Sequence, residues 1–338
     1  MKLSSLPLVV VCLLFWTSVS LAQRSAFEEG VKLTEARKFK QAAELFSQAI
    51  QREPTNSAAY RFLGWCQSEL GQHDVAVESA KKAISLDPSD YVAQSNLGWA
   101  LTMLGRFDEA VTELTSSIKI NPTYALAHNN LGAAYLKQGR DEEAVRELKL
   151  AIQLNPKDER PRGSIAEYYI RTGKFREAAA EFEYLTGLFP NKAQWYSGLG
   201  FAYFSLGEHQ KSIGALQQAT LLDPKNIADL RHLAIAQVAA GKRVEAIATM
   251  QQTLVLKPND FETLMSLALV LSTVGRFEDA IGYGKQAIEI RPNSERIVMV
   301  VAMTYVQKGD KESARSYLPK LRELDEDLAK TLEKALAR

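Results

Sequence analysis

Residues 125–158 read ALAHNNLGAAYLKQGRDEEAVRELKLAIQLNPKD, and this 34-residue stretch decides the fold. In its first half Leu131 and Tyr135 recur at the spacing of one helix face, and in its second half Ala144 and Leu148 do the same. The glycine between the halves can take the left-handed conformation that ends a helix, and the proline near the end cannot continue one. The stretch therefore predicts two amphipathic helices joined by a turn.

The same punctuation recurs along the chain with a period of 34 residues. The prolines of this lattice are Pro54, Pro88, Pro122, Pro156, Pro190, Pro224, Pro258 and Pro292, and the glycines are Gly71, Gly105, Gly139, Gly173, Gly207, Gly241, Gly275 and Gly309. Small residues form two further series, Gly or Ala in the first helices and Ala or, once, Ser in the second. Helices cross closely only where neither carries a bulky side chain, so these series predict the crossing points. Internal repetition at this length predicts a solenoid.

These residues resemble the tetratricopeptide repeat family. The Leu-Gly or Leu-Ala pair of that family is present at Leu131-Gly132 and Leu233-Ala234, and its tyrosine at Tyr135. The resemblance implies an all-α, right-handed superhelix of about nine helix-turn-helix repeats with a C-terminal capping helix. It also implies a scaffold that binds proteins or peptides, similar to bacterial scaffold proteins of the family. The expected repeats are residues 23–56, 57–90, 91–124, 125–158, 159–192, 193–226, 227–260, 261–294 and a degenerate 295–328, followed by the capping helix at 329–338.

Three repeats depart from the pattern. The first has Arg37 where the lattice glycine is expected. The fifth opens with Pro161 two residues into its first helix, so we expect that helix to start late or bend. The ninth carries Pro319 inside its second helix, which predicts a kink there. Terminal repeats of a solenoid are expected to be atypical because their outer face meets water.

Residues 1–22 have the layout of a secretory signal peptide. Lys2 precedes an apolar run from Leu6 to Trp16, and small residues lead to a cleavage position after Ala22. An uncleaved anchor is the alternative, although a spanning helix needs about 20 apolar residues. Cleavage leaves Cys66 as the only cysteine, and no Asn-x-Ser/Thr acceptor occurs. We therefore expect an exported protein, periplasmic or secreted, and a bacterial envelope fits it better than a eukaryotic secretory pathway.

Composition and motifs exclude several classes of function. Without Lys2 the chain has 40 basic and 40 acidic residues, so no net charge attracts nucleic acid or a membrane surface. The four histidines fall in four different repeats, and neither a phosphate loop nor a serine-nucleophile motif occurs. We expect no cofactor, no metal site and no catalytic site. Because ten residues remain outside the repeats, we also expect no catalytic domain and no enzymatic activity.

The ninth residue of each repeat suggests where a ligand binds. In the family this position tends to face the concave groove, yet here eight of the nine residues are apolar. Tryptophan and arginine dominate binding hot spots, and asparagine can pair with an extended backbone. The hypothesis is a ligand groove that contains Arg61, Trp65, Asn96, Trp99, Asn129, Asn130, Glu167, Phe201 and Arg231. The alternative is that this apolar row packs between neighbouring first helices as the edge of the core.

The expected partner is a protein or peptide segment with an apolar anchor. Some family members clamp a C-terminal carboxylate with lysine, arginine and asparagine, but of those positions only Arg61 and one asparagine, Asn96 or Asn130, are present here. Carboxylate-tail binding of that type is therefore not expected. Two other classes stay open. One is self-association with a second copy of the chain as a structural array, and the other is binding of a small molecule or glycan.

Overall fold

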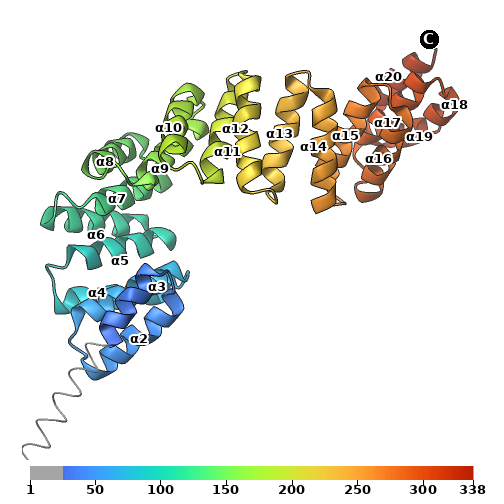
Figure 1. The fold of residues 1–338 in the computed structure, drawn as a ribbon. Helices are drawn as coiled ribbons and strands as arrows, with labels where there is room; N and C mark the ends of the chain where they lie inside the picture. The colour runs from blue at the N-terminus through green and yellow to red at the C-terminus, as the bar shows by residue number, and fades with distance from the viewer. Residues whose placement is uncertain (1–25, 338) are drawn as a thin grey trace, which may run out of the picture. The chain divides into compact units, whose positions relative to one another are not determined.

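The computed structural model describes residues 26–337, and within that range the chain consists of helices and short turns, with no strand. The predicted all-α repeat solenoid is thereby confirmed. The predicted signal peptide, residues 1–22, lies outside the described residues. The chain divides into two compact units, Met1–Ile165 and Ala166–Arg338. Each is a stack of helices in chain order (Figure 1).

In the first unit, helical residues 26–35 are followed by seven helices and by the start of α9 (Glu159–Arg171). These seven are α2 (Phe39–Arg52), α3 (Ser57–Glu69), α4 (His73–Leu86), α5 (Tyr91–Met103), α6 (Phe107–Ile120), α7 (Ala125–Gln138) and α8 (Asp141–Leu154). The first helix of a repeat packs against the second helix of the same repeat and also against the first helix of the next, as α3 does against α4 and α5.

The second unit continues the same arrangement from within α9. Its repeat helices are α10 (Phe175–Leu188), α11 (Ala193–Ser205), α12 (His209–Leu222), α13 (Ile227–Ala239), α14 (Arg243–Leu256), α15 (Phe261–Thr273), α16 (Phe277–Ile290) and α17 (Glu295–Lys308). Three shorter segments close it: α18 (Lys311–Arg315), α19 (Leu318–Leu324) and α20 (Glu326–Ala337).

The lattice glycines act as the sequence predicts. All eight have positive φ, between +73° and +89°, where a side chain would be strained. Arg37 takes the same left-handed conformation, with φ of 56°, at the place where the first repeat lacks the glycine. A non-glycine residue there costs about 1 kcal/mol or more. The turn geometry is therefore imposed by the packing of the flanking helices even where the residue opposes it.

The small residues of the first helices mark the predicted crossing points. A Cβ added to Gly132 would lie 2.6 Å from Leu148 Cγ and 3.1 Å from the backbone oxygen of Ala144. At Gly200 the added atom would lie 2.5 Å from Leu216 Cγ. Both leucines are fully buried, so neither can withdraw without opening a cavity. The small residues that recur every 34 positions in the sequence thus lie where the two helices of a repeat approach each other most closely.

Two expectations about irregular helices are wrong in detail. α9 begins at Glu159, in step with the other first helices, although the sequence suggested a late start. Asp158 accepts the backbone N–H of Arg160, and Pro161 falls in the first turn, where an amide has no intrahelical partner to lose. In the ninth repeat the predicted kinked helix is instead two helices, α18 and α19, and Pro319 lies in the first turn of the second.

The closing helix starts earlier than the predicted capping segment at residue 329. α20 begins at Glu326, because Asp325 accepts the backbone N–H groups of Asp327 and Leu328 and so caps it. Its inner face buries Ala329, Leu332 and Leu336 in the core that α17 shares. α20 therefore covers the apolar surface at the end of the stack, which would otherwise be exposed to water.

Candidate ligand-binding cavity

The first unit contains a cavity of about 980 Å³ that runs along its first helices. Residues of the opening helix, the starts of α2 and α9, and α3, α5 and α7 line it, together with the turns before α2 and α7. Its lining combines five aromatic rings with six charged side chains. We call it the first-unit cavity.

Aromatic rings form two groups on the cavity wall. Trp65 meets the ring of Phe39 edge-on at 5.8 Å, and Phe62 lies 6.3 Å from the Trp65 ring. Tyr91 and Tyr124 form an edge-to-face pair at 5.0 Å. Burial raises the pKa of Tyr124 to about 12, so this phenol stays neutral at physiological pH. Such rings present a large, rigid contact area at low entropic cost.

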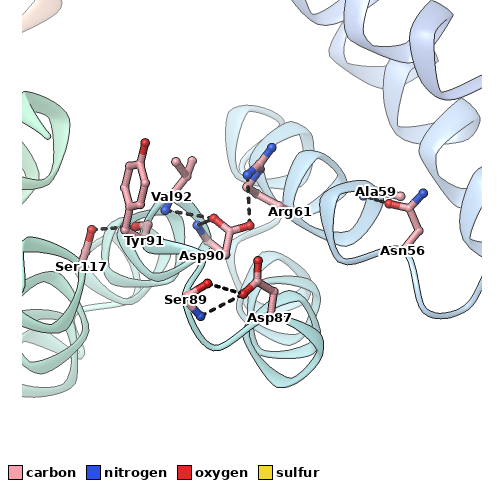
Figure 2. A network of polar contacts seen from close by, with 10 residues as sticks. Asn56, Ala59, Arg61, Asp87, Ser89, Asp90, Tyr91, Val92 and Ser117 are labelled. Atoms are coloured by element: carbon pink, nitrogen blue, oxygen red, sulfur yellow. Dashed lines mark hydrogen bonds and ion pairs between the residues drawn. The ribbon is translucent and has the colours of Figure 1, made fainter. Parts of the chain in front are cut away.

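Arg61 is held in the cavity by the residue that caps the next repeat. Asp90 accepts the backbone N–H groups of Val92 and Ala93 with one carboxylate oxygen and therefore caps α5. Its other oxygen lies 3.1 Å from Arg61 Nη1. Figure 2 shows Asp90 between the Arg61 side chain and the start of α5, and Ser117 donating to the carbonyl of Tyr91. The ion pair thus links α3 to the residue that caps α5 and orients the guanidinium.

Arg160, at the start of α9, also lines the cavity and is fixed in a similar way. Its Nε and Nη2 lie 2.9 Å and 2.6 Å from the two oxygens of Asp158. This contact raises the pKa of the guanidinium, so the arginine stays charged. Bidentate pairs of this kind hold a guanidinium plane in one orientation.

Three of the nine residues predicted for the groove line this cavity, namely Arg61, Trp65 and Asn96. Trp99 is half-buried and does not line it. Asn129 and Asn130 are buried, 6% and 5% exposed, and form a polar contact within the stack. Asn129 donates to Asn130, which donates to Ser95 Oγ of α5. Asn130 therefore joins neighbouring first helices, and neither of these buried asparagines presents its amide to a ligand.

The other three predicted residues lie in the second unit, beside two smaller cavities. Glu167 and Phe201 line one of about 340 Å³, and Arg231 lines another of about 400 Å³. Arg231 lies 3.7 Å from Asp260, which begins the next first helix as Asp90 does. Six of the nine predicted groove residues therefore line cavities, and these six are distributed over three separate ones.

Sequence reasoning missed Tyr91 and Tyr124, which form one wall of the first-unit cavity. Tyr91 opens α5 and Tyr124 precedes α7, both outside the ninth-residue series. Two signals could have found part of this wall. One signal is that the first and the last residue of a single repeat, 91–124, are both tyrosine. The other is that arginine as the fifth residue of a repeat coincides twice with aspartate as its last, at Arg61 with Asp90 and at Arg231 with Asp260.

A buried histidine ties the turn before α7 to the second helix of its repeat. His128 is 3% exposed, with Nδ1 2.6 Å from Glu147 and Nε2 3.0 Å from the carbonyl oxygen of Pro122. The hydrogen bond to Glu147 raises the pKa of the imidazole, with a further contribution from the Pro122 carbonyl. Only the doubly protonated ring donates to both acceptors.

Stability that depends on His128 is expected to fall as the pH rises. A folded-state pKa above the unfolded value stabilises the fold fully below the unfolded pKa, and this contribution disappears as the pH passes the folded one. His128→Gln should therefore lose about 1 kcal/mol more unfolding free energy at pH 5.5 than at pH 9. Urea unfolding at both pH values measures this. In a Glu147→Gln background the pH dependence should become smaller, because only the Pro122 carbonyl then favours the charged ring, and an undiminished pH dependence there would contradict the assignment.

Other features of the described residues give no second site. Cys66 is buried, and burial raises the pKa of its thiol to about 12. Within residues 26–337, no three His, Cys, Asp or Glu side chains are grouped as a metal ion would require. In the same range, no helix is both long and apolar enough to cross a membrane.

Sequence comparison identifies the repeat. A tetratricopeptide repeat profile matches residues 27–91, 164–227 and 232–295, and three more profiles of this repeat match residues 79–112, 100–139 and 125–158. No curated protein matches the chain in sequence.

Solved structures show the same fold at low identity. PilW, described as a widely conserved type IV pilus biogenesis factor, is 21% identical over 63% of this chain and 96% of its own, with a TM-score of 0.55. A tetratricopeptide repeat protein from Parabacteroides merdae is 19% identical over 74% and 99%, with a TM-score of 0.50. The APC/C hetero-tetramer Cut9-Hcn1 is 18% identical over 82% and 54%, with a TM-score of 0.52. At these identities the likeness shows the fold alone.

Proposed function

Because the chain belongs to the tetratricopeptide repeat family, whose members bind protein partners, we propose that it is a non-enzymatic scaffold that binds a peptide or protein segment in its first-unit cavity. The observation that carries the proposal is the cavity itself, about 980 Å³ with Trp65 and four further aromatic rings in its wall. Sites that bind ligands are typically concave and apolar with a few oriented polar groups. Arg61, fixed by Asp90, is such a group.

We also propose that the scaffold works in the cell envelope, in assembly or secretion. Support comes from the signal-peptide layout of residues 1–22. A structure named for a pilus biogenesis factor shares the fold, which is compatible with this setting but identifies no partner. The mass of the chain recovered from an envelope fraction tests cleavage after Ala22.

Replacing Trp65 by alanine is expected to weaken partner binding about 30-fold, since loss of a buried tryptophan anchor typically costs about 2 kcal/mol. Partners are captured from the envelope fraction on the immobilised chain and quantified by mass spectrometry. Trp99→Ala is the matched control, because Trp99 is the same residue one repeat later and does not line the cavity. Circular dichroism checks that both variants remain folded.

The outcomes separate the cavity from other binding modes. Loss in Trp65→Ala with retention in Trp99→Ala supports the proposal. Equal retention in both variants contradicts it, and equal loss would favour the whole ninth-residue row over the cavity. Light scattering before capture shows whether a second copy of the chain already occupies the site, which is the alternative partner.

A further inference from the structure

Carboxylates outnumber guanidinium groups around the first-unit cavity. Its charged lining consists of Glu35, Glu69, Glu159, Arg37, Arg61 and Arg160. Asp90 and Asp158 lie directly behind two of these arginines, in the ion pairs described above. Three glutamates and three arginines therefore line the cavity, and counting the two aspartates behind the arginines brings five carboxylates against three guanidinium groups.

Two of the three lining arginines are paired with aspartates, whereas two of the three lining glutamates form no ion pair among the described residues. Arg61 is paired with Asp90 and also lies over the Phe62 ring at 5.1 Å. Arg160 is paired with both oxygens of Asp158. Glu35 and Glu69, by contrast, are exposed. Neither has an ion-pair partner among residues 26–337.

One helix face places a free carboxylate next to the aromatic wall. Arg61, Trp65 and Glu69 follow one another at four-residue intervals on α3, so they lie on the same face. Glu69 is one turn beyond Trp65. Arg37, which forms no ion pair with any residue from 26 to 337, lies in the turn before Phe39. Aromatic faces carry negative electrostatic potential and attract a lysine or arginine within about 6 Å of the ring.

We propose that the first-unit cavity recognises a basic segment, a lysine or arginine side chain beside an apolar residue, and that its partner presents such a segment. The inference rests on the scaffold function proposed above and names its ligand chemistry. The aromatic rings take the apolar residue and the stem of the cation, and Glu35 and Glu69 take its charge. A partner that presents an acidic segment meets the excess carboxylates and is disfavoured.

A positional-scanning decapeptide library, bound to the immobilised full chain, tests the ligand chemistry directly. We expect lysine and arginine pools with a neighbouring apolar residue to be retained about tenfold over glutamate and aspartate pools. In Glu35→Gln/Glu69→Gln this preference should fall to less than about threefold, because only the charge is removed at exposed positions. Glu44→Gln/Glu142→Gln, which alters exposed carboxylates outside the cavity lining, should keep it.

Each outcome bears on a different claim. Retention of apolar pools that depends on Trp65 but not on peptide charge overturns the basic-segment inference and leaves the scaffold proposal standing. Enrichment of acidic pools or of free C-terminal carboxylates also overturns the inference. If no pool depends on Trp65, both the inference and the cavity as a binding site are contradicted.

Discussion

Replacing Gly132 by valine is expected to lower the free energy of unfolding by about 2–3 kcal/mol. The first added carbon would already lie 2.6 Å from Leu148 Cγ, and the backbone oxygen of Ala144 is within 3.1 Å. A flexible side chain can move away, but here the nearest groups are a fully buried leucine and a helix backbone. The two helices of the repeat must therefore separate, and the contacts of α7 and α8 with their neighbours weaken with them.

Gly214→Ala is the matched control for this effect. Gly214 is also a mid-helix glycine, in α12, but it is exposed and nothing lies within 4 Å of an added Cβ. Alanine there should stabilise the chain by about 0.5–1 kcal/mol, because it removes the entropic penalty of glycine in a helix. Urea unfolding of both variants measures the contrast. If Gly132→Val were as stable as the parent, α7 and α8 could separate at this crossing without loss of stability, and the prediction would be wrong.

The contrast between these glycines explains why the fold could be predicted from the sequence. Helix ends and crossings depend on residue types with local effects, such as a glycine with positive φ or a proline without an amide. Those residues recur every 34 positions, so the sequence shows them many times. Errors arose where a capping aspartate sets the start of a helix against the expectation from a proline or from a repeat boundary, as Asp158 does before Pro161 and Asp325 does before α20.

The site could be predicted only in part, because it depends on contacts between repeats. The ninth-residue series identified Trp65, yet the series treats every repeat alike and so also selected Trp99, which lies outside the cavity. Asn130 was chosen for its hydrogen-bonding capacity, but a serine on α5 already uses it. Which polar group remains available to a ligand follows from its partners in the folded chain, and residue type alone does not reveal them.

Replacing Phe46 by alanine is expected to have the largest effect, a loss of about 3–5 kcal/mol from the first repeat. Phe46 is fully buried in α2, stacks on Phe62 at 5.2 Å and meets Phe27 edge-on at 5.6 Å. Truncation removes the centre of this cluster, and Gly30, which lies against the Phe46 ring, cannot fill the space. Because Phe62 also lines the first-unit cavity, the loss of its stacking partner is expected to disorder the aromatic wall of that cavity as well.

Repeats of a solenoid contact only their neighbours, so the loss should be local. Hydrogen exchange is expected to show faster amide exchange over residues 26–69 and unchanged protection in the second unit, with ligand capture reduced as in Trp65→Ala. Leu221→Ala, at a side chain 73% exposed on α12, should change stability by less than about 0.5 kcal/mol. Equal loss of protection in both units after Phe46→Ala would mean that the chain unfolds as one cooperative body, and the cavity could not then be altered independently of the rest.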